Sequence, residues 1–259
     1  MPAKTPSEDH GSGYEGVGEF YDLFADNSDI PFHIEYARRT GSPILELAAG
    51  TGRIALRLAE EGFEVVALEK SQSMIAQARK KTALLSRGVS NRVRLVEGSM
   101  ESFSLGQKFA LIIVPNSFGH LLTFDDQLSA LRCVKEHLLD EGTFILDLYP
   151  GELQYEHATF EDPPAVLPDG RRVIRFGVIE SDFQRKLMRL ELRYTIQDAD
   201  GVVLQVINVF SSAALIFKQD ADRLIQLAGL HIEDELGDFD GEPYTPESGR
   251  RIFILKKIA

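Results

Sequence analysis

The feature that most constrains the fold is a strand, glycine-turn and helix pattern in residues 43–53. A short apolar run leads into a turn that contains Gly50 and Gly52, and a helical apolar pattern begins directly afterwards. A second apolar run follows at 65–68 and ends in Glu69. Glycines in such a turn can adopt positive φ and let a ligand approach the backbone closely. Because open α/β sheets bind ligands beyond the carboxyl ends of their strands, the pattern predicts a ligand site at this turn.

Two carboxylates indicate what the ligand carries. Glu69 ends the second strand and can accept hydrogen bonds from a ribose diol, which suits a nicotinamide dinucleotide as well as an adenosyl-sulfonium compound. Glu46 lies four residues before Gly50. An anion at that place would repel a pyrophosphate but would attract the ammonium group of a methionine moiety. Glu46 therefore favours the adenosyl-sulfonium compound.

Further segments follow in an order that resembles class I S-adenosylmethionine (SAM) methyltransferases. Residues 46–52 match the acid-x-x-x-Gly-x-Gly pattern of motif I, and residues 69–74 match an acid-x-Ser-x-x-Met segment. Residues 93–100 resemble the third strand and the loop that contacts adenine, and residues 109–117 resemble the fourth strand and motif IV. Each match is weak by itself, and it is their order and spacing that carry the resemblance.

The N-terminal residues and the segment after the fourth strand narrow the resemblance. Tyr14 and Tyr21 match the Tyr-x6-Tyr-Asp-Leu-Phe pattern of amino-sugar N-methyltransferases. Residues 117–121 resemble small-molecule N-methyltransferases, which include glycine N-methyltransferase. The resemblance implies that Tyr14 lies near the methyl acceptor and Tyr21 near the methionine end of the cofactor. The expected cofactor is SAM, and the expected partner is a small-molecule acceptor with an amine nitrogen.

The resemblance also implies a set of cofactor-binding residues. Glu46 would receive the methionine amino group, directly or through the glycine loop, and Glu69 would accept the ribose hydroxyls. Ser99 stands where the family often has Asp, so a weaker contact with the adenine amine is expected there, and Met100 would offer its backbone amide to the ring. The expected cofactor-binding residues are Tyr21, Glu46, Ala48, Gly50, Gly52, Glu69, Lys70, Met74, Ser99, Met100, Pro115 and Asn116.

Methyl transfer from a sulfonium needs positioning more than acid–base chemistry, because the positive charge already activates the methyl group. A general base helps only when the nucleophile arrives protonated. His120 follows the fourth strand, where methyl group and acceptor should meet, and the reference pKa of histidine lies near neutrality. We expect His120 to orient an amine or to remove its proton, with a structural role as the open alternative. His120 and Tyr14 are the expected catalytic residues.

Composition excludes several classes of function. Lys and Arg number 28 against 40 Asp and Glu, and the net charge of −12 disfavours general binding to nucleic acid or to anionic membranes. The longest apolar run, 109–114, is too short to span a membrane, and the first residues lack an apolar secretory region, so a cytoplasmic location is expected. The single cysteine, Cys133, allows no intramolecular disulfide, and the histidines lack metal-ligand spacing, so no metal is expected.

The 259 residues fit one α/β domain with an insertion. We expect a disordered tail at 1–13, and a Rossmann-like, doubly wound, mostly parallel sheet in 14–150 that residues 218–259 complete with an antiparallel C-terminal strand. Residues 151–170 are expected to form mostly a loop, and residues 172–180, 186–197 and 202–217 alternate like strands. The segment 151–217 therefore predicts a small inserted antiparallel β-sheet of three or four strands, which is either a lid or substrate wall or a homo-oligomer interface. The five expected parallel strands are 44–47, 65–68, 93–96, 111–114 and 144–148.

Three alternatives to amine methylation stay open. An O-methyltransferase acting on a sugar, phenol or carboxylate would share the cofactor site, because the fold does not report the acceptor. An NAD(P)-dependent oxidoreductase is formally compatible with Gly50-x-Gly52-x-x-Ala55, although the Tyr-x-x-x-Lys pair of short-chain dehydrogenases is absent. A non-catalytic relative that binds SAM is the third alternative, although nothing in the sequence disables the cofactor site.

Overall fold

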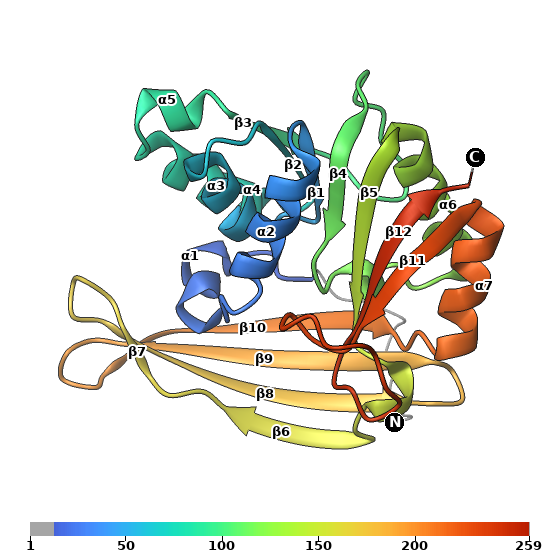
Figure 1. The fold of residues 1–259 in the computed structure, drawn as a ribbon. Coiled ribbons are helices and arrows are strands. Elements are labelled where there is room, and N and C mark those ends of the chain that lie inside the picture. Colours follow the sequence, from blue (N-terminus) through green and yellow to red (C-terminus); the bar gives the residue numbers. More distant parts are fainter. Residues whose placement is uncertain (1–12, 259) are drawn as a thin grey trace.

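A computed structural model describes residues 13–258 and shows two sheets (Figure 1). The first sheet has seven strands in the order β11-β12-β5-β4-β1-β2-β3. Strands β1 to β5 run parallel to one another, and β12 runs antiparallel to β5, which confirms the predicted mixed sheet. The bounds are β1 Ile44–Leu47, β2 Val65–Glu69, β3 Val93–Glu97, β4 Phe109–Val114, β5 Leu138–Leu148, β11 Leu230–Leu236 and β12 Arg251–Lys257.

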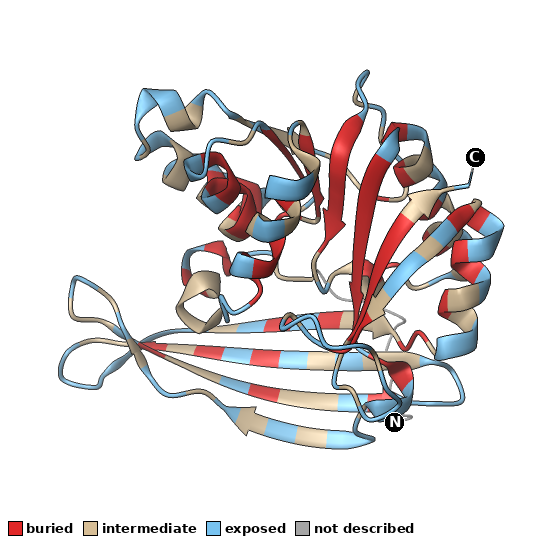
Figure 2. Cartoon of the chain, viewed as in Figure 1, coloured by how far each residue is buried: buried red, intermediate tan, exposed pale blue. Residues whose placement is uncertain are grey.

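Helices cover both faces of this sheet because successive residues of a strand point to opposite faces. Leu45 and Leu47 of β1 pack into one cluster with the helices on that side, and Ile44 packs into a second cluster on the other side. Figure 2 shows the central strands buried along most of their length. The first cluster includes side chains of α6 (Phe124–His137) and α7 (Lys218–Ala228), and the second includes side chains of α2 (Ile30–Thr40) and α3 (Arg53–Glu60).

Local sequence signals set several helix ends. Ser71 caps α4 (Gln72–Ala83), since its hydroxyl accepts a hydrogen bond from the Met74 amide at 3.3 Å. Thr123 caps α6 in the same way through the Asp126 amide at 3.1 Å. Gly229 ends α7 with a φ of 70°, the left-handed conformation that glycine adopts most easily. The remaining short helices are α1 Gly18–Tyr21, η1 Asp22–Phe24, α5 Arg87–Ser90, η2 Phe118–His120 and η3 Gly151–Leu153.

The second sheet comes from the segment between β5 and α7. Its path is β10-β9-β8-β6, all antiparallel, and the short strand β7 pairs with β8. Figure 1 shows it running across the end of the first sheet, with α1 above it. Tyr194 is fully buried between the two parts, and it packs in one cluster with Val17 and Phe20. The bounds are β6 His157–Glu161, β7 Ala165–Val166, β8 Arg172–Asp182, β9 Leu187–Gln197 and β10 Val203–Ala214.

Two strand boundaries differ from the sequence prediction. The β5 strand begins at Leu138 instead of residue 144, because Leu138 pairs with Phe109 across a register shift before the main pairing starts at Thr143. The stretch 151–170 before β8 was expected as a loop but contains β6 and β7, which are only five and two residues long and depend on pairing with β8. Of the predicted tail at 1–13, only Gly13 lies within the described residues.

A buried histidine on α2 makes the stability depend on pH. His33 is 0% exposed, and neither of its ring nitrogens has a hydrogen-bond partner among the described residues. Burial lowers its pKa from 6.5 to about 4. Between those values the unfolded chain binds more protons than the folded one, so stability is lost as the pH falls through this window. The difference in pKa corresponds to roughly 3 kcal/mol.

We therefore expect urea unfolding to show that His33→Phe loses less stability at acid pH than the wild type does. Between pH 7 and pH 4 the free energy of unfolding should fall about 3 kcal/mol less in the variant, because the variant has no imidazole to protonate. His157→Phe, which removes an exposed histidine of β6, is the matched control. Parallel pH profiles for wild type and His33→Phe would contradict the assignment.

Candidate active site

A cavity of about 350 Å³ lies beyond the carboxyl ends of β1, β2, β3 and β4. The loops after these strands form its wall together with the N-terminal segment and two residues of β10. Most residues predicted from sequence therefore come together, although they lie far apart along the chain. The predicted residues that line the cavity are Tyr14, Tyr21, Ala48, Gly50, Glu69, Lys70, Met74, Ser99, Met100, Asn116 and His120.

Three predicted residues do not line this cavity. Glu46 is 3% exposed, and its Oε2 atom has no hydrogen-bond partner among the described residues. Burial raises the pKa of Glu46 to about 8, while the charge of Arg53 opposes that rise. Gly52 precedes α3 with a φ of 76°, the left-handed conformation that glycine adopts easily, and does not line the cavity. Pro115 follows β4 outside the lining. The proposed cofactor contacts of these three residues stay predictions.

The Glu69 carboxylate is held in place at the end of β2. Its Oε2 atom accepts a hydrogen bond from the Gly50 amide at 2.8 Å, and its Oε1 atom accepts one from the Ser71 amide at 2.7 Å. Each carboxylate oxygen has a second lone pair that can accept a further hydrogen bond. Two backbone amides thus fix a cavity-lining acceptor in one orientation, which suits recognition of a diol.

Backbone strain is concentrated at this site. Within residues 13–258, the non-glycine residues with positive φ are Ala48 at 53°, Asn116 at 42° and Lys186 at 52°. Ala48 and Asn116 both line the cavity. Such conformations are costly and occur where the surrounding structure enforces them, often at binding sites. The strained turns after β1 and β4 therefore support the assignment of this cavity as the functional site.

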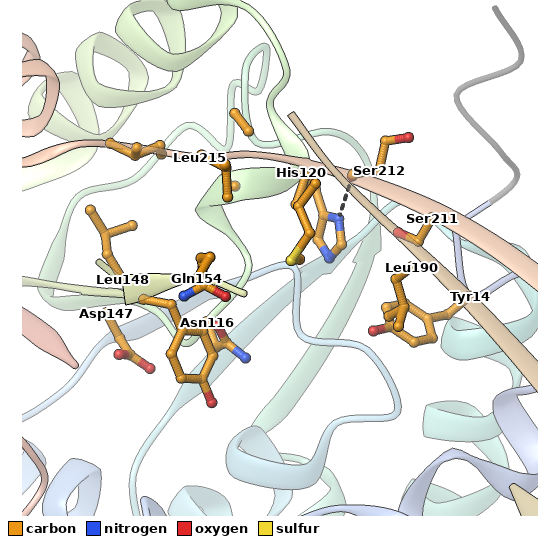
Figure 3. Close-up of a pocket in the computed structure, with 16 residues that line it drawn as sticks. Tyr14, Asn116, His120, Asp147, Leu148, Gln154, Leu190, Ser211, Ser212 and Leu215 are labelled. Carbon is orange, nitrogen blue, oxygen red and sulfur yellow. Dashed lines mark hydrogen bonds between the residues drawn. The ribbon is translucent and has the colours of Figure 1, made fainter. Parts of the chain in front are cut away.

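A second cavity of about 200 Å³ adjoins the first (Figure 3). The end of β5, the η2 turn and the inner residues of β9 and β10 form its wall. The β9 and β10 residues were missed because the segment 151–217 shows no readable motif. The residues that line both cavities are Tyr14, Asn116, His120, Ser211 and Ser212, so the two spaces meet at these side chains.

His120 stands at this meeting point with a defined tautomer. Its Nδ1 atom lies 3.3 Å from the carbonyl oxygen of Ser212 (Figure 3). A carbonyl can only accept a hydrogen bond, so Nδ1 carries the proton and Nε2 keeps a lone pair. Burial lowers the pKa of His120, although the contact with Ser212 opposes this effect. The ring is therefore neutral near pH 7 and can accept a proton at Nε2.

Two tyrosines form the wall beside His120. The Tyr14 ring meets His120 edge to face at 6.0 Å and Tyr21 at 5.3 Å between ring centroids. Burial raises the pKa of both phenols above the ordinary value. Both phenols therefore stay protonated near neutrality, where they can donate hydrogen bonds but cannot act as bases.

Polar contacts hold the N-terminal segment against the first, larger cavity. Asp22 accepts hydrogen bonds from Thr51, in the glycine turn, at 2.5 Å and from Lys81 at 2.6 Å. At the other side, Glu15 accepts a hydrogen bond from the Ser71 hydroxyl at 2.6 Å. The segment that carries Tyr14 and Tyr21 is thus held at both sides of the cavity. The sequence patterns did not single out these contacts.

The sequence patterns also did not reveal Asp147, an acidic residue that lines the second cavity. Asp147, at the end of β5, is 1% exposed and pairs with Arg250 at 2.9 Å. Burial raises the pKa of Asp147 to about 6, while Arg250 opposes the rise. Arg250 also donates to the Tyr149 hydroxyl at 2.8 Å. Because Arg250 lies 103 residues from Asp147, no local pattern reveals the pair.

Two kinds of feature are absent from residues 13–258. No group of three or more His, Cys, Asp or Glu side chains is arranged to hold a metal ion. No helix in this range has the length and apolar character needed to cross a bilayer.

Comparison with known proteins adds family evidence. Residues 44–142 match a family model described as methyltransferase domain. The dTDP-3-amino-3,4,6-trideoxy-alpha-D-glucopyranose N,N-dimethyltransferase of Streptomyces venezuelae is 27% identical, over 95% of this chain and 97% of its own length. A glycine/sarcosine N-methyltransferase of Halorhodospira halochloris is 33% identical, over 56% of this chain and 57% of its own length. The structure of the CcbJ methyltransferase from Streptomyces caelestis has the same fold, with a TM-score of 0.77 at 22% identity over 96% of this chain and 98% of that chain.

Proposed function

We propose that this chain acts as a SAM-dependent methyltransferase that methylates the amine nitrogen of a small molecule. The observation that carries the proposal is the junction of the two cavities at Tyr14, Asn116 and His120. A cofactor in the larger cavity and an acceptor in the smaller one would meet beside the Nε2 lone pair of His120. The relatives named above act, by their names, on an amino sugar and on glycine or sarcosine, and both acceptors are amines.

The lining of the larger cavity supports one orientation for SAM. Glu69 offers the ribose its fixed carboxylate, and the loop at Ser99 and Met100 lines the end beyond β3, where the base would lie. The glycine turn at Gly50 would then hold the methionine end, and Tyr14, Asn116 and His120 would face the methyl group at the junction. When bound, SAM supplies a methyl group that its positive sulfur activates for in-line displacement.

The residues at the junction would prepare the acceptor. An amine that arrives as an ammonium ion transfers one proton to Nε2 of His120, which frees the nitrogen lone pair. That lone pair then forms the new carbon–nitrogen bond as the carbon–sulfur bond breaks. Tyr14 covers the reacting atoms and excludes water. Met188 and Leu190 of β9 line the acceptor side, which supports a substrate-wall role for the inserted segment 151–217.

Two separate measurements test this proposal. Calorimetry should show binding of SAM and of S-adenosylhomocysteine, and no binding of NADH. A methyl-transfer assay over a panel of aminosugars, glycine and sarcosine should then give N-methylated products by mass spectrometry. Tight binding of NADH without binding of either sulfur compound would overturn the proposal. A cytoplasmic location and a homo-oligomer formed through the second sheet stay predictions.

A further inference from the structure

We propose that Glu101 selects the base of the cofactor, because its carboxylate accepts a hydrogen bond from the exocyclic amine of adenine. This inference rests on the proposed use of SAM. The loop after β3 lines the larger cavity with Ser99, which carries no carboxylate, and with Glu101, which supplies one to the same wall two residues further on.

The side chains of Ser99 and Glu101 form one unit. Both line the larger cavity, and the Ser99 hydroxyl donates a short hydrogen bond to Oε2 of Glu101. A carboxylate can only accept, so this contact uses the proton of Ser99 and leaves the Oε1 atom of Glu101 for a ligand. The pair therefore presents hydrogen-bond acceptors to the cavity and no donor.

Hydrogen bonds from α6 hold the backbone of this loop in place. The Glu101 carbonyl accepts hydrogen bonds from the Ser129 hydroxyl at 2.8 Å and from the Cys133 thiol at 3.7 Å, both on α6. Within the loop, the Ser102 amide donates to the Ser99 carbonyl at 3.2 Å. A carboxylate on a loop held this way loses little freedom when a ligand arrives, so the contact is preorganised.

The strand order places the base at this loop. Glu69, at the end of β2, is the fixed acceptor for the ribose, and the glycine turn follows the neighbouring strand β1. The strand on the other side of β2 is β3, and the loop with Glu101 follows it. The Gly98 amide donates to the Glu69 carbonyl at 3.0 Å, which keeps the two strand ends together. A base attached to the ribose therefore lies against the loop.

The wall formed by Ser99 and Glu101 offers only hydrogen-bond acceptors, so it favours adenine over hypoxanthine. Adenine presents an amine to it and donates a hydrogen bond, whereas hypoxanthine presents a carbonyl oxygen, which faces the carboxylate without a shared proton. Hydrogen bonds to charged groups of this kind correspond to roughly tenfold to hundredfold in affinity. The wild-type protein should therefore bind S-adenosylhomocysteine about tenfold to hundredfold more tightly than S-inosylhomocysteine.

Calorimetry with these two compounds tests the proposal on the full-length chain. Glu101→Gln should reduce the preference for adenine to a few-fold or invert it, because a rotated amide can donate to the carbonyl oxygen of hypoxanthine. Ser99→Ala should keep most of the preference, since the carboxylate remains. Glu97→Gln is the matched control, because Glu97 is an exposed residue of β3 that does not line the cavity. Circular dichroism verifies that each variant is folded.

The outcomes separate this inference from the proposed function. If the wild type binds neither nucleoside, the proposed function fails. If it binds both with equal affinity, SAM use stands and the role of Glu101 is overturned. Loss of the preference in Ser99→Ala but not in Glu101→Gln would assign the selection to the serine instead and would equally overturn the inference.

Discussion

Replacement of Glu69 by alanine should weaken SAM binding by about 10² to 10⁴-fold, the largest effect that we expect for a single residue at this site. A hydrogen bond to a charged group contributes about 1.5–3 kcal/mol, and the carboxylate is placed to accept two from the ribose diol. Its two amide contacts, at 2.7 and 2.8 Å, hold it in that orientation before the ligand arrives. Little binding energy is then used to order the side chain.

Calorimetry with S-adenosylhomocysteine and its 2′-deoxy analogue distinguishes ribose recognition from support of the loop. The wild type should prefer the compound with both hydroxyls, and Glu69→Ala should bind the two compounds equally weakly. Glu97→Ala is the control, because Glu97 pairs with Glu69 in register on the neighbouring strand but has an exposed side chain. An unchanged dissociation constant in Glu69→Ala would exclude the ribose contact.

His120→Ala should lower kcat by about 10² to 10³-fold at pH 7, the range of a positioned general base, with the affinity for SAM unchanged. Burial lowers the pKa of His120 below 6.5, so the base form is already present at neutral pH. The wild-type rate should therefore stay flat near neutrality and fall only as the pH drops below 6.5. The variant depends on amine that is already free, so its rate should rise about tenfold per pH unit below the pKa of the amine.

Steady-state kinetics from pH 5.5 to pH 9 would record this difference, once an amine acceptor is known. His157→Ala removes an exposed histidine of β6 and should behave like the wild type. If His120→Ala keeps the wild-type rate at every pH, His120 is no base. A variant that loses the same factor at every pH would indicate that the ring only orients the acceptor.

Predictions of the main sheet succeeded where short apolar runs alternate with helical patterns. The runs at 65–68 and 111–114 became β2 and β4, whose side chains are all buried. Such strands are apolar on both faces, so their pattern survives without knowledge of their partners. The β6 strand was missed because it is only five residues long and none of them is buried, so only its pairing with β8, from His157 with Glu180 onward, defines it.

The cofactor side of the site was readable because its residues follow strand ends in consecutive motifs. Gly50 and Glu69 lie 19 residues apart, yet both strand ends are visible in the sequence, so their meeting was predictable. Glu101 was missed in the sequence, where its only signal is an acid two residues after Ser99. Asp147 gave none, since its significance depends on the distant Arg250 and on the second cavity.

The sequence by itself determined the strand-turn-helix unit and the carboxylate at the end of β2, because residues within one supersecondary unit interact over short stretches of chain. Only the tertiary structure decided where an acceptor can lie. Residues of β10 complete that cavity, and Ser212 sets the tautomer of His120 from 92 residues away. Such a contact depends on how two sheets pack against each other, and neither segment records it in its own pattern.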